Sequence, residues 1–278
     1  MGWFGSPAGE AGLPSLKFSQ GDQALASFDS EDVVKDFVAM IAWEKRLARE
    51  GPFFRELFRS YGVRSVLDLA CGPGRHAALF ASWGLEAWGA DASPAMIKLS
   101  REYAREKGVR PRFVRAAYGK LRKTIHRRFD AIINIGNSLV QVGNQRELEI
   151  LLEEGRALLN PGGIFLSQTR NYDGYGEDFL EALPVTSRSG PGGETLFLRL
   201  HQRQGERIRF YLVKLVPEGK VWKACPRMTW FYRVTRANLA RALREAGFRR
   251  AQWFGGYDRS PFDPQASPDL VLLVRALG

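Results

Sequence analysis

The chain has 278 residues, 45% of them hydrophobic, so it can form one large domain, or a domain with a substantial insertion, around its own core. Two cysteines and three histidines without ligand spacing predict neither a disulfide framework nor a metal site, and no apolar run is long enough for a membrane span. The net charge of +11 leaves an acidic partner open, and the lack of a secretory leader predicts a cytoplasmic protein.

The first sixty residues are predicted to form an irregular arm followed by two helices. Residues 1–30 are rich in Gly, Ser and Pro and show weak periodicity. From Asp32 to Phe58 apolar residues recur at helical spacing. Gly51 and Pro52 interrupt this run, so the first helix is expected to end there.

Strand and helix patterns alternate up to residue 170. Strands are predicted at residues 65–69, 87–90, 112–115, 129–135 and 164–169, and helices at 75–82, 94–107 and 145–159. A further helix at 236–246 and strands at 250–254 and 270–274 close the chain. The alternation predicts an α/β fold with a doubly wound, mostly parallel, seven-stranded sheet.

The pattern changes between residue 170 and residue 235. Residues 171–193 are predicted to be a long loop with a short helix near Phe179. Segments 196–200, 207–213 and 227–232 alternate as antiparallel strands do, with turns at Gly205 and Gly219. We therefore expect an arm (1–30), a main domain (31–170 and 235–278) and an antiparallel insertion acting as a lid (171–234).

The strongest functional signal is a Gly-rich turn. Residues 66–78 read VLDLACGPGRHAA, in which an apolar strand carries Asp68 and is followed by Gly72, Gly74 and a helix-compatible stretch. Dinucleotides and S-adenosylmethionine both use such a turn, because glycine permits positive φ and close approach of a ligand. Gly72, Gly74 and Ala77 also fit the dinucleotide fingerprint, so the glycines do not decide between these ligands.

Asp68 favours S-adenosylmethionine. A carboxylate beside the turn would repel a pyrophosphate, whereas it attracts the ammonium and sulfonium of the methyl donor. Asp91, 19 residues after Gly72, can accept both ribose hydroxyls of either ligand. A tight turn without a ligand would explain the glycines but not two acidic strand ends. We therefore predict S-adenosyl-L-methionine as cofactor, with S-adenosyl-L-homocysteine as product.

At these motifs the chain resembles the class I S-adenosylmethionine-dependent methyltransferases, and within them most the glycine/sarcosine N-methyltransferase group. The resemblance rests on residues 43–47 (WEKRL), 68–74, 91–93 (DAS), 135–138 (IGNS), 159–163 (LNPGG) and 170–173 (RNYD). The GNS and RNYD segments point to this group, and the others are general to the class. The resemblance implies a Rossmann-like methyltransferase fold, N-methylation of a small, carboxylate-bearing amine, and a possible homo-oligomer.

The resemblance also implies two sets of site residues. The donor is expected to contact Arg46, Asp68, Ala70, Gly72, Gly74, Arg75, Asp91, Ala92, Met96, Ala117, Tyr118 and Ile135. The acceptor is expected to contact Asn137, Arg170, Tyr172 and Tyr232. Three residues, Asn137, Arg170 and Tyr211, are expected to act on the reacting groups.

Each of these roles has a structural alternative. Arg170 has a planar fork that matches the acceptor's carboxylate, but it can instead pair with Asp173 or with an acid of the insertion. Asn137 can accept from the acceptor amine or be a satisfied turn asparagine. Tyr211 and Tyr232 are expected near the sulfonium, where aromatic groups suit a cation, with packing in the core as the alternative.

Three departures from the group leave the acceptor open. After the third strand no acidic or amide side chain is available for the adenine edge, so backbone amides are expected there, with Tyr118 against the ring. Gln141 replaces a histidine of glycine-specific members, and Phe197 falls near a tyrosine of the family. An RNA methyltransferase, a small-molecule O-methyltransferase and a non-catalytic donor-binding module are the alternatives, with nucleic acid the less favoured partner.

Overall fold

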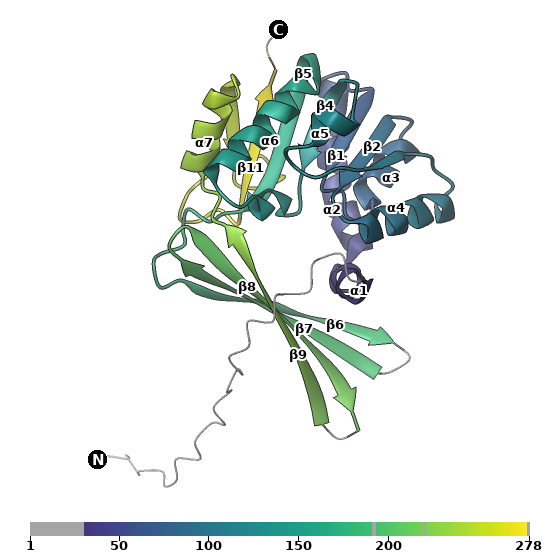
Figure 1. Cartoon of the computed structure of the whole chain (residues 1–278), viewed down its shortest axis with the longest axis vertical. Helices are drawn as coiled ribbons and strands as arrows, with labels where there is room; N and C mark the ends of the chain where they lie inside the picture. Colours follow the sequence, from purple (N-terminus) through teal and green to yellow (C-terminus); the bar gives the residue numbers. More distant parts are fainter. Residues whose placement is uncertain (1–30, 191–192, 220, 277–278) are drawn as a thin grey trace, which may run out of the picture.

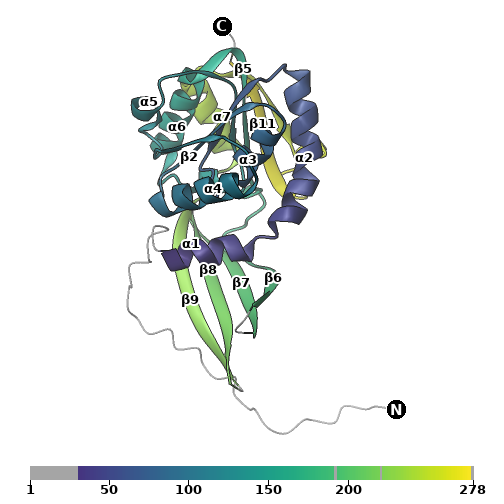
Figure 2. The ribbon, with the colours of Figure 1, turned by 90° about the vertical axis from the view of Figure 1, so that its right-hand side faces the viewer.

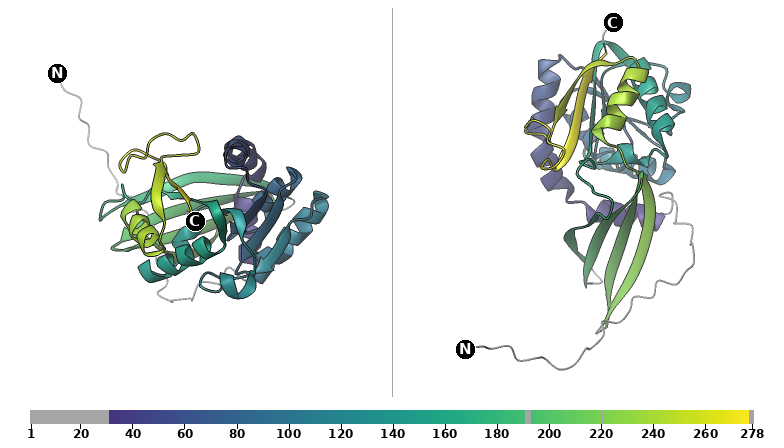
Figure 3. Two further views of the ribbon diagram at one scale, coloured as in Figure 1. Left: turned by 90° about the horizontal axis from the view of Figure 1, so that it is seen from above. Right: turned by 90° about the vertical axis from the view of Figure 1, so that its left-hand side faces the viewer.

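The computed structural model describes residues 31–190, 193–219 and 221–276, and the predicted arm of residues 1–30 lies outside them. Helices cover a seven-stranded sheet on both faces, and a four-stranded sheet projects from one end of this domain (Figures 1 and 3). The chain forms the smaller sheet after the fifth strand of the larger sheet. It then returns to the main domain, where it forms the last helix.

The larger sheet has the strand order β10-β11-β5-β4-β1-β2-β3. Its strands are β1 (Ser65–Leu69), β2 (Glu86–Asp91), β3 (Arg112–Arg115), β4 (Phe129–Asn134), β5 (Leu159–Arg170), β10 (Arg249–Phe254) and β11 (Asp269–Arg275). Five adjacent strands are parallel to one another: β3, β2, β1, β4 and β5. Strand β11 is antiparallel to both β5 and β10. The predicted doubly wound, mostly parallel sheet is therefore confirmed.

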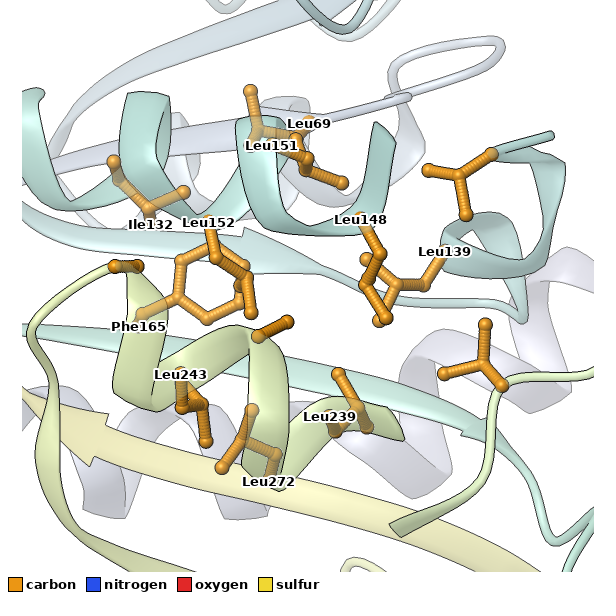
Figure 4. Packing of buried hydrophobic residues seen from close by; sticks show 14 of the residues in the cluster. Leu69, Ile132, Leu139, Leu148, Leu151, Leu152, Phe165, Leu239, Leu243 and Leu272 are labelled. Atoms are coloured by element: carbon orange, nitrogen blue, oxygen red, sulfur yellow. The ribbon is translucent and has the colours of Figure 1, made fainter. Parts of the chain in front are cut away.

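Two apolar layers sandwich this sheet, because successive strand residues point to opposite faces. The helices are α2 (Trp43–Ser60), α3 (Arg75–Ser82), α4 (Pro94–Glu106), α5 (Leu121–Thr124), α6 (Gln145–Ala157) and α7 (Arg236–Glu245), with a 3-10 turn η1 (Ser138–Gln141). Leu152 of α6 and Leu243 of α7 pack near Phe165 of β5, and Leu148 of α6 lies beside Leu139 (Figure 4). On the other face, α2 and α3 contribute a second cluster that includes Phe54 and Phe80.

The boundary between the first two helices differs from the prediction. Helix α1 spans Glu31–Met40 and α2 continues through Pro52, so the break falls at Ile41 and Ala42. A proline inside a helix costs about 3 kcal/mol. Four phenylalanine and leucine side chains of α2 beyond this point are buried, and each stabilises the packed helix by about 1.5–3 kcal/mol. The free energy gained by burying these side chains exceeds the cost of the proline, so the helix continues through Pro52.

The insertion is a four-stranded antiparallel sheet of order β6-β7-β8-β9. Its strands are β6 (Leu180–Gly190), β7 (Gly193–Gln204), β8 (Arg207–Glu218) and β9 (Val221–Tyr232). The predicted turn glycines Gly205 and Gly219 both have positive φ. The expectation of a loop and short helix up to residue 193 was wrong, because β6 begins at Leu180 and tolerates Pro184 at a bulge on the sheet edge.

Candidate donor and acceptor site

The Gly-rich turn between β1 and α3 has the left-handed backbone that its glycines predict. Gly72 has φ 52° and Gly74 has φ 70° at the N-cap of α3. A Cβ on Gly74 would lie 2.7 Å from the ring of Phe113, so the position also needs the absence of a side chain. Asp91, at the end of β2, accepts from the backbone N–H of Gly72 at 2.8 Å and of Ser93 at 2.9 Å, which fixes the turn.

The carboxyl ends of β1, β2 and β4 open into a cleft of about 620 Å³, part of which is open to solvent. The predicted donor contacts Arg46, Asp68, Ala70, Gly72, Asp91, Met96 and Ile135 all line it. So do Phe37, Trp43, Cys71, Pro73, His76, Ser93, Gly136, Ser138 and Gln141. A crevice beyond the carboxyl ends of the strands is the usual ligand position in an open α/β sheet.

Asp68, on β1, is a buried carboxylate. It is 2% exposed, and its Oδ2 has no hydrogen-bond partner among the described residues. Burial raises the pKa of Asp68 well above its usual range, although the charge of Arg46 opposes this shift. A cation placed here would satisfy the oxygen, so the residue fits the positive groups of the methyl donor.

Arg46 is held at the cleft by two residues that sequence analysis did not single out. Its Nε donates to Glu50 Oε1 at 3.0 Å, and His76 Nε2 lies 2.8 Å from Glu50 Oε2. Burial opposes ionisation of Glu50, but the hydrogen bonds from His76 and Arg46 and their charges lower its pKa overall. The guanidinium lies so close to Gly136 that a Cβ there would come within 2.8 Å of it. The helical spacing of Arg46 and Glu50 was the available sequence signal.

Two further predicted donor contacts lie beside the turn and not on the cleft surface. Arg75 begins α3 and stacks its guanidinium 3.5 Å from the ring centre of Tyr103. Ala92 follows Asp91, and its carbonyl accepts from Arg115 Nε at 3.1 Å. Gly74 likewise shapes the turn from behind, through its packing against α4 and β3.

The loop after β3 also stays off the cleft surface. The Ala117 carbonyl accepts from the N–H of Lys120 at 3.1 Å. Tyr118 packs against the main core, and its hydroxyl accepts from Asn134 Nδ2 at 2.7 Å. Burial raises the pKa of Tyr118 above its usual value. A neutral, hydrogen-bonded hydroxyl orients this ring between β4 and the loop, beside the predicted adenine end.

Asn137 connects the ends of β4 and β5. It follows Gly136 with φ 64°, its Oδ1 accepts from the N–H of Arg170 at 3.0 Å, and its Nδ2 donates to the hydroxyl of Tyr172 at 2.8 Å. Tyr172 itself is fully buried. The arrangement is that of the satisfied turn asparagine, and it places Arg170 at the carboxyl end of β5.

Arg170 pairs with an acid of the insertion. Its Nη2 lies 2.7 and 2.8 Å from the two carboxylate oxygens of Glu181 on β6. Tyr175 donates its hydroxyl to the same carboxylate at 2.6 Å. Asp173, the other acid considered, instead accepts from the backbone N–H of Arg236 at 2.9 Å.

The two insertion tyrosines are not at the cleft. Tyr211 lies on the opposite face of β8 from Phe210 and Leu212, which pack inward, and its hydroxyl accepts from Arg209 at 3.1 Å. The expectation that Tyr211 lies near the sulfonium is therefore not supported, because strand alternation turns it outward. Tyr232 bonds instead to Gln145 of α6, at 3.3 Å.

The fold and the Gly-rich turn are similar to those of known methyltransferases. Residues 66–163, from β1 to the start of β5, match the family model of a methyltransferase domain. A solved S-adenosylmethionine-dependent methyltransferase from Clostridium acetobutylicum ATCC 824 covers 88% of this chain and 96% of its own, at a TM-score of 0.70 and 17% identity. A sugar N-methyltransferase from Streptoalloteichus sp ATCC 53650 covers 99% and 100%, at 0.69 and 18%. The chain thus has the Rossmann-like methyltransferase fold.

Curated relatives narrow the resemblance within this class. A glycine/sarcosine N-methyltransferase of Parasynechococcus marenigrum (strain WH8102) is 33% identical over 163 residues, which are 56% of this chain and 58% of the relative. That of Halorhodospira halochloris is 34% identical over 149 residues, 52% and 56% of the two chains. The match spans little more than half the length of these relatives. The predicted resemblance to the glycine/sarcosine N-methyltransferase group is confirmed.

Within residues 31–190, 193–219 and 221–276 no helix is long and apolar enough to cross a membrane. The same part of the chain contains no group of three or more His, Cys, Asp or Glu side chains that could hold a metal ion.

Proposed function

We propose that the protein is an S-adenosylmethionine-dependent methyltransferase that acts in the cytoplasm on the amine of a small molecule bearing a carboxylate. The observation that carries the proposal is the buried carboxylate of Asp68 beside the Gly-rich turn, whose Oδ2 has no hydrogen-bond partner in the described part of the chain. The match of residues 66–163 to a methyltransferase domain and the glycine/sarcosine relatives support it. The main domain (31–170 and 235–278) binds the donor, and the insertion (171–234) closes over it.

The donor end of the cleft offers a group for each charge of the ligand. In this proposal Asp68 would bind the ammonium, Arg46 the carboxylate, and Asp91 the ribose hydroxyls. Ala70, Met96 and the other cleft residues supply van der Waals contact to the rest of the donor. When bound, the donor supplies an electrophilic methyl group on a sulfonium, which is a good leaving group.

The protein's contribution to the reaction is alignment and exclusion of water. A neutral amine displaces the methyl group in line, so little acid–base chemistry is required beyond loss of the ammonium proton before attack. Holding the two reactants together is worth up to roughly 7–11 kcal/mol. In this proposal Arg170 anchors the acceptor's carboxylate and Asn137 positions Arg170, while Tyr172 and Tyr232 support the acceptor side from behind.

The proposal also includes a second copy of the chain as partner. The outer face of the four-stranded sheet carries exposed apolar side chains such as Trp222 and Trp230. Nucleic acid is not part of the proposal. The most basic segment contains the short helix α5, whose Leu121 is buried, and adjacent Arg127 pairs with Glu86.

Calorimetric titration with S-adenosylmethionine tests the donor assignment, with NADH as the control ligand. We expect micromolar donor affinity and no heat from NADH. Asp91→Ala should abolish donor binding, because it removes the carboxylate that accepts from the ribose hydroxyls. It also removes the hydrogen bonds that fix the Gly-rich turn. Arg170→Ala should leave the donor affinity unchanged and abolish binding of glycine or sarcosine to the loaded protein.

The contrary results are distinct. If wild-type protein does not bind the donor, the reading of Asp68 is wrong. If Arg170→Ala also loses the donor, Arg170 belongs to the donor site. Turnover of amines without a carboxylate, at the same efficiency as glycine or sarcosine, would contradict the assigned substrate class.

A further inference from the structure

The Arg170–Glu181 pair occupies the position that the proposed function gives to the acceptor's carboxylate. Arg170 ends β5 at the main sheet, and Glu181 belongs to β6 of the insertion. Their side chains are 31% and 30% exposed, so a small carboxylate in solution can reach both. The pair is therefore accessible and spans the boundary between the two sheets.

The pair does not use the full fork of the guanidinium. Both carboxylate oxygens of Glu181 contact the same nitrogen, Nη2, while the buried Nε of Arg170 has no hydrogen-bond partner among the described residues. The strongest arginine–carboxylate geometry uses two nitrogens in parallel. A free carboxylate is not tied to a strand as Glu181 is, so it can adopt a two-nitrogen geometry on Arg170 once Glu181 has left.

Tyr175 and His201 hold Glu181 in this place. Tyr175 donates to the Glu181 carboxylate, and His201 Nδ1 lies 3.3 Å from the same hydroxyl. Since the single hydroxyl hydrogen goes to Glu181, His201 is the donor to Tyr175. Burial lowers the pKa of His201 to about 4, so it is neutral and adds no charge of its own. Glu181 is thus positioned by a chain of hydrogen bonds from β7.

We propose that Glu181 is an internal competitor for the acceptor's carboxylate: it occupies Arg170 in the free protein, and the acceptor displaces it. The inference rests on the proposed function, because it assumes that Arg170 is the carboxylate site. Displacement frees the β6 end of the insertion from the main domain as the acceptor enters. Glu181 therefore sets how strongly a carboxylate must bind in order to be accepted, and it is a specificity-determining residue.

Competition has a measurable consequence. An acceptor's apparent dissociation constant is its intrinsic value divided by the fraction of molecules in which Arg170 is free of Glu181. A partly exposed pair supported by a hydrogen bond should raise it by roughly three- to ten-fold. Glu181→Gln removes the competing charge and should tighten carboxylate binding by this factor. Tyr175→Phe keeps the charge of Glu181 but removes the hydrogen bond that holds it. This variant should therefore also tighten carboxylate binding, by a smaller factor.

Acetate binding to protein saturated with S-adenosylhomocysteine measures this without catalysis. Ethylamine, which lacks a carboxylate, is the ligand control and should show no gain in either variant. The matched protein control is Glu206→Gln, which removes an exposed acid of the turn between β7 and β8 that lies 4.0 Å from Arg233. Circular dichroism and thermal melting confirm that each variant is folded.

The outcomes separate this inference from the proposed function. The inference is supported if acetate binds more tightly to Glu181→Gln and Tyr175→Phe but not to Glu206→Gln. Equal or weaker binding in both variants overturns it and makes the pair a structural tether, as does an equal gain in Glu206→Gln. Loss of acetate binding in every protein, wild type included, also overturns it. A normal acetate response without methyl transfer to any amine would instead refute only the proposed function.

Discussion

At the scale of single residues, Asp68 makes donor binding depend on pH. Its pKa in the folded, unliganded protein is raised by burial, so near that pKa the carboxyl is partly protonated. The donor's positive groups favour the anion. Binding should therefore release a proton, and affinity should increase with pH until the folded-state pKa is passed. Calorimetry in buffers of different ionisation enthalpy measures the release. Heats that do not depend on the buffer would contradict it.

The same residue affects stability with a defined sign. A carboxyl whose pKa is raised on folding stabilises the protein below its unfolded pKa, and this contribution is lost as pH rises through the folded pKa. Asp68→Asn should therefore melt higher than wild type at neutral pH. It should also bind the donor about 10- to 100-fold more weakly, because a hydrogen bond to a charged group is worth about 1.5–3 kcal/mol.

Residue patterns predicted the parts of the site that belong to a local motif. Asp68, Gly72 and Asp91 have fixed spacing along one strand–turn–helix–strand unit, so their meeting at the cleft follows from the sequence. Glu50 and Tyr211 did not fit this logic. Glu50 binds Arg46 and is itself held by His76 on another helix, and the orientation of Tyr211 depends on which face of the insertion covers the cleft. Only the packed sheet defines such relationships.

At the scale of elements, helix α1 closes the cleft from the side of the insertion. It lies across the junction of the two sheets (Figure 2), and its Phe37 lines the cleft. Asp36 pairs with Lys214 of β8 at 2.7 Å and with Arg227 of β9 at 3.3 Å. Arg188 of β6 donates to carbonyls in the last turn of α1, where a positive charge is favourable.

Asp36→Asn should loosen this contact. It leaves two partly buried cations without their counter-ion, which should lower the stability by about 2 kcal/mol. The donor should dissociate several-fold faster, because α1 opens more often, while turnover at saturating donor stays close to wild type. Stopped-flow dissociation and thermal melting measure both effects. Glu218→Gln, at the far end of β8, is the control, and an unchanged dissociation rate in Asp36→Asn would show that α1 does not gate the cleft.

Element prediction failed where local signals opposed tertiary packing. Pro52 indicated a helix end, but the buried face of α2 continues beyond it against α3 and the sheet. The segment after Asp173 contains Gly, Asp and Pro, which favour loops, yet its second half pairs along β7 from Leu180 onward. Pairing with its one neighbouring strand, β7, makes this segment a strand. The main-domain strands and helices were predictable because propensity, period and turn residues agreed there.

At the scale of the whole molecule, the four-stranded sheet has two unlike faces. Phe197, His201 and Leu212 point inward and are buried. The alternate positions on the outer face are mostly apolar and at least partly exposed: Leu196, Leu198, Leu200, Tyr211, Val213, Leu215, Met228 and Trp230. Four strands of about twelve residues present roughly 20 by 40 Å, or about 800 Å². A standard stable interface buries about this area on each partner.

Because an apolar sheet face can stack on a copy of itself about a twofold axis, we expect a dimer through this surface. Val213→Lys, at its centre, should produce monomers in sedimentation velocity at micromolar concentrations, since two buried lysines would face each other. Donor affinity should not change, because the outer face points away from the cleft. Tyr61→Ser, an exposed aromatic position at the end of α2, should leave the dimer intact. A wild type that sediments as a monomer at these concentrations would contradict the expected dimer.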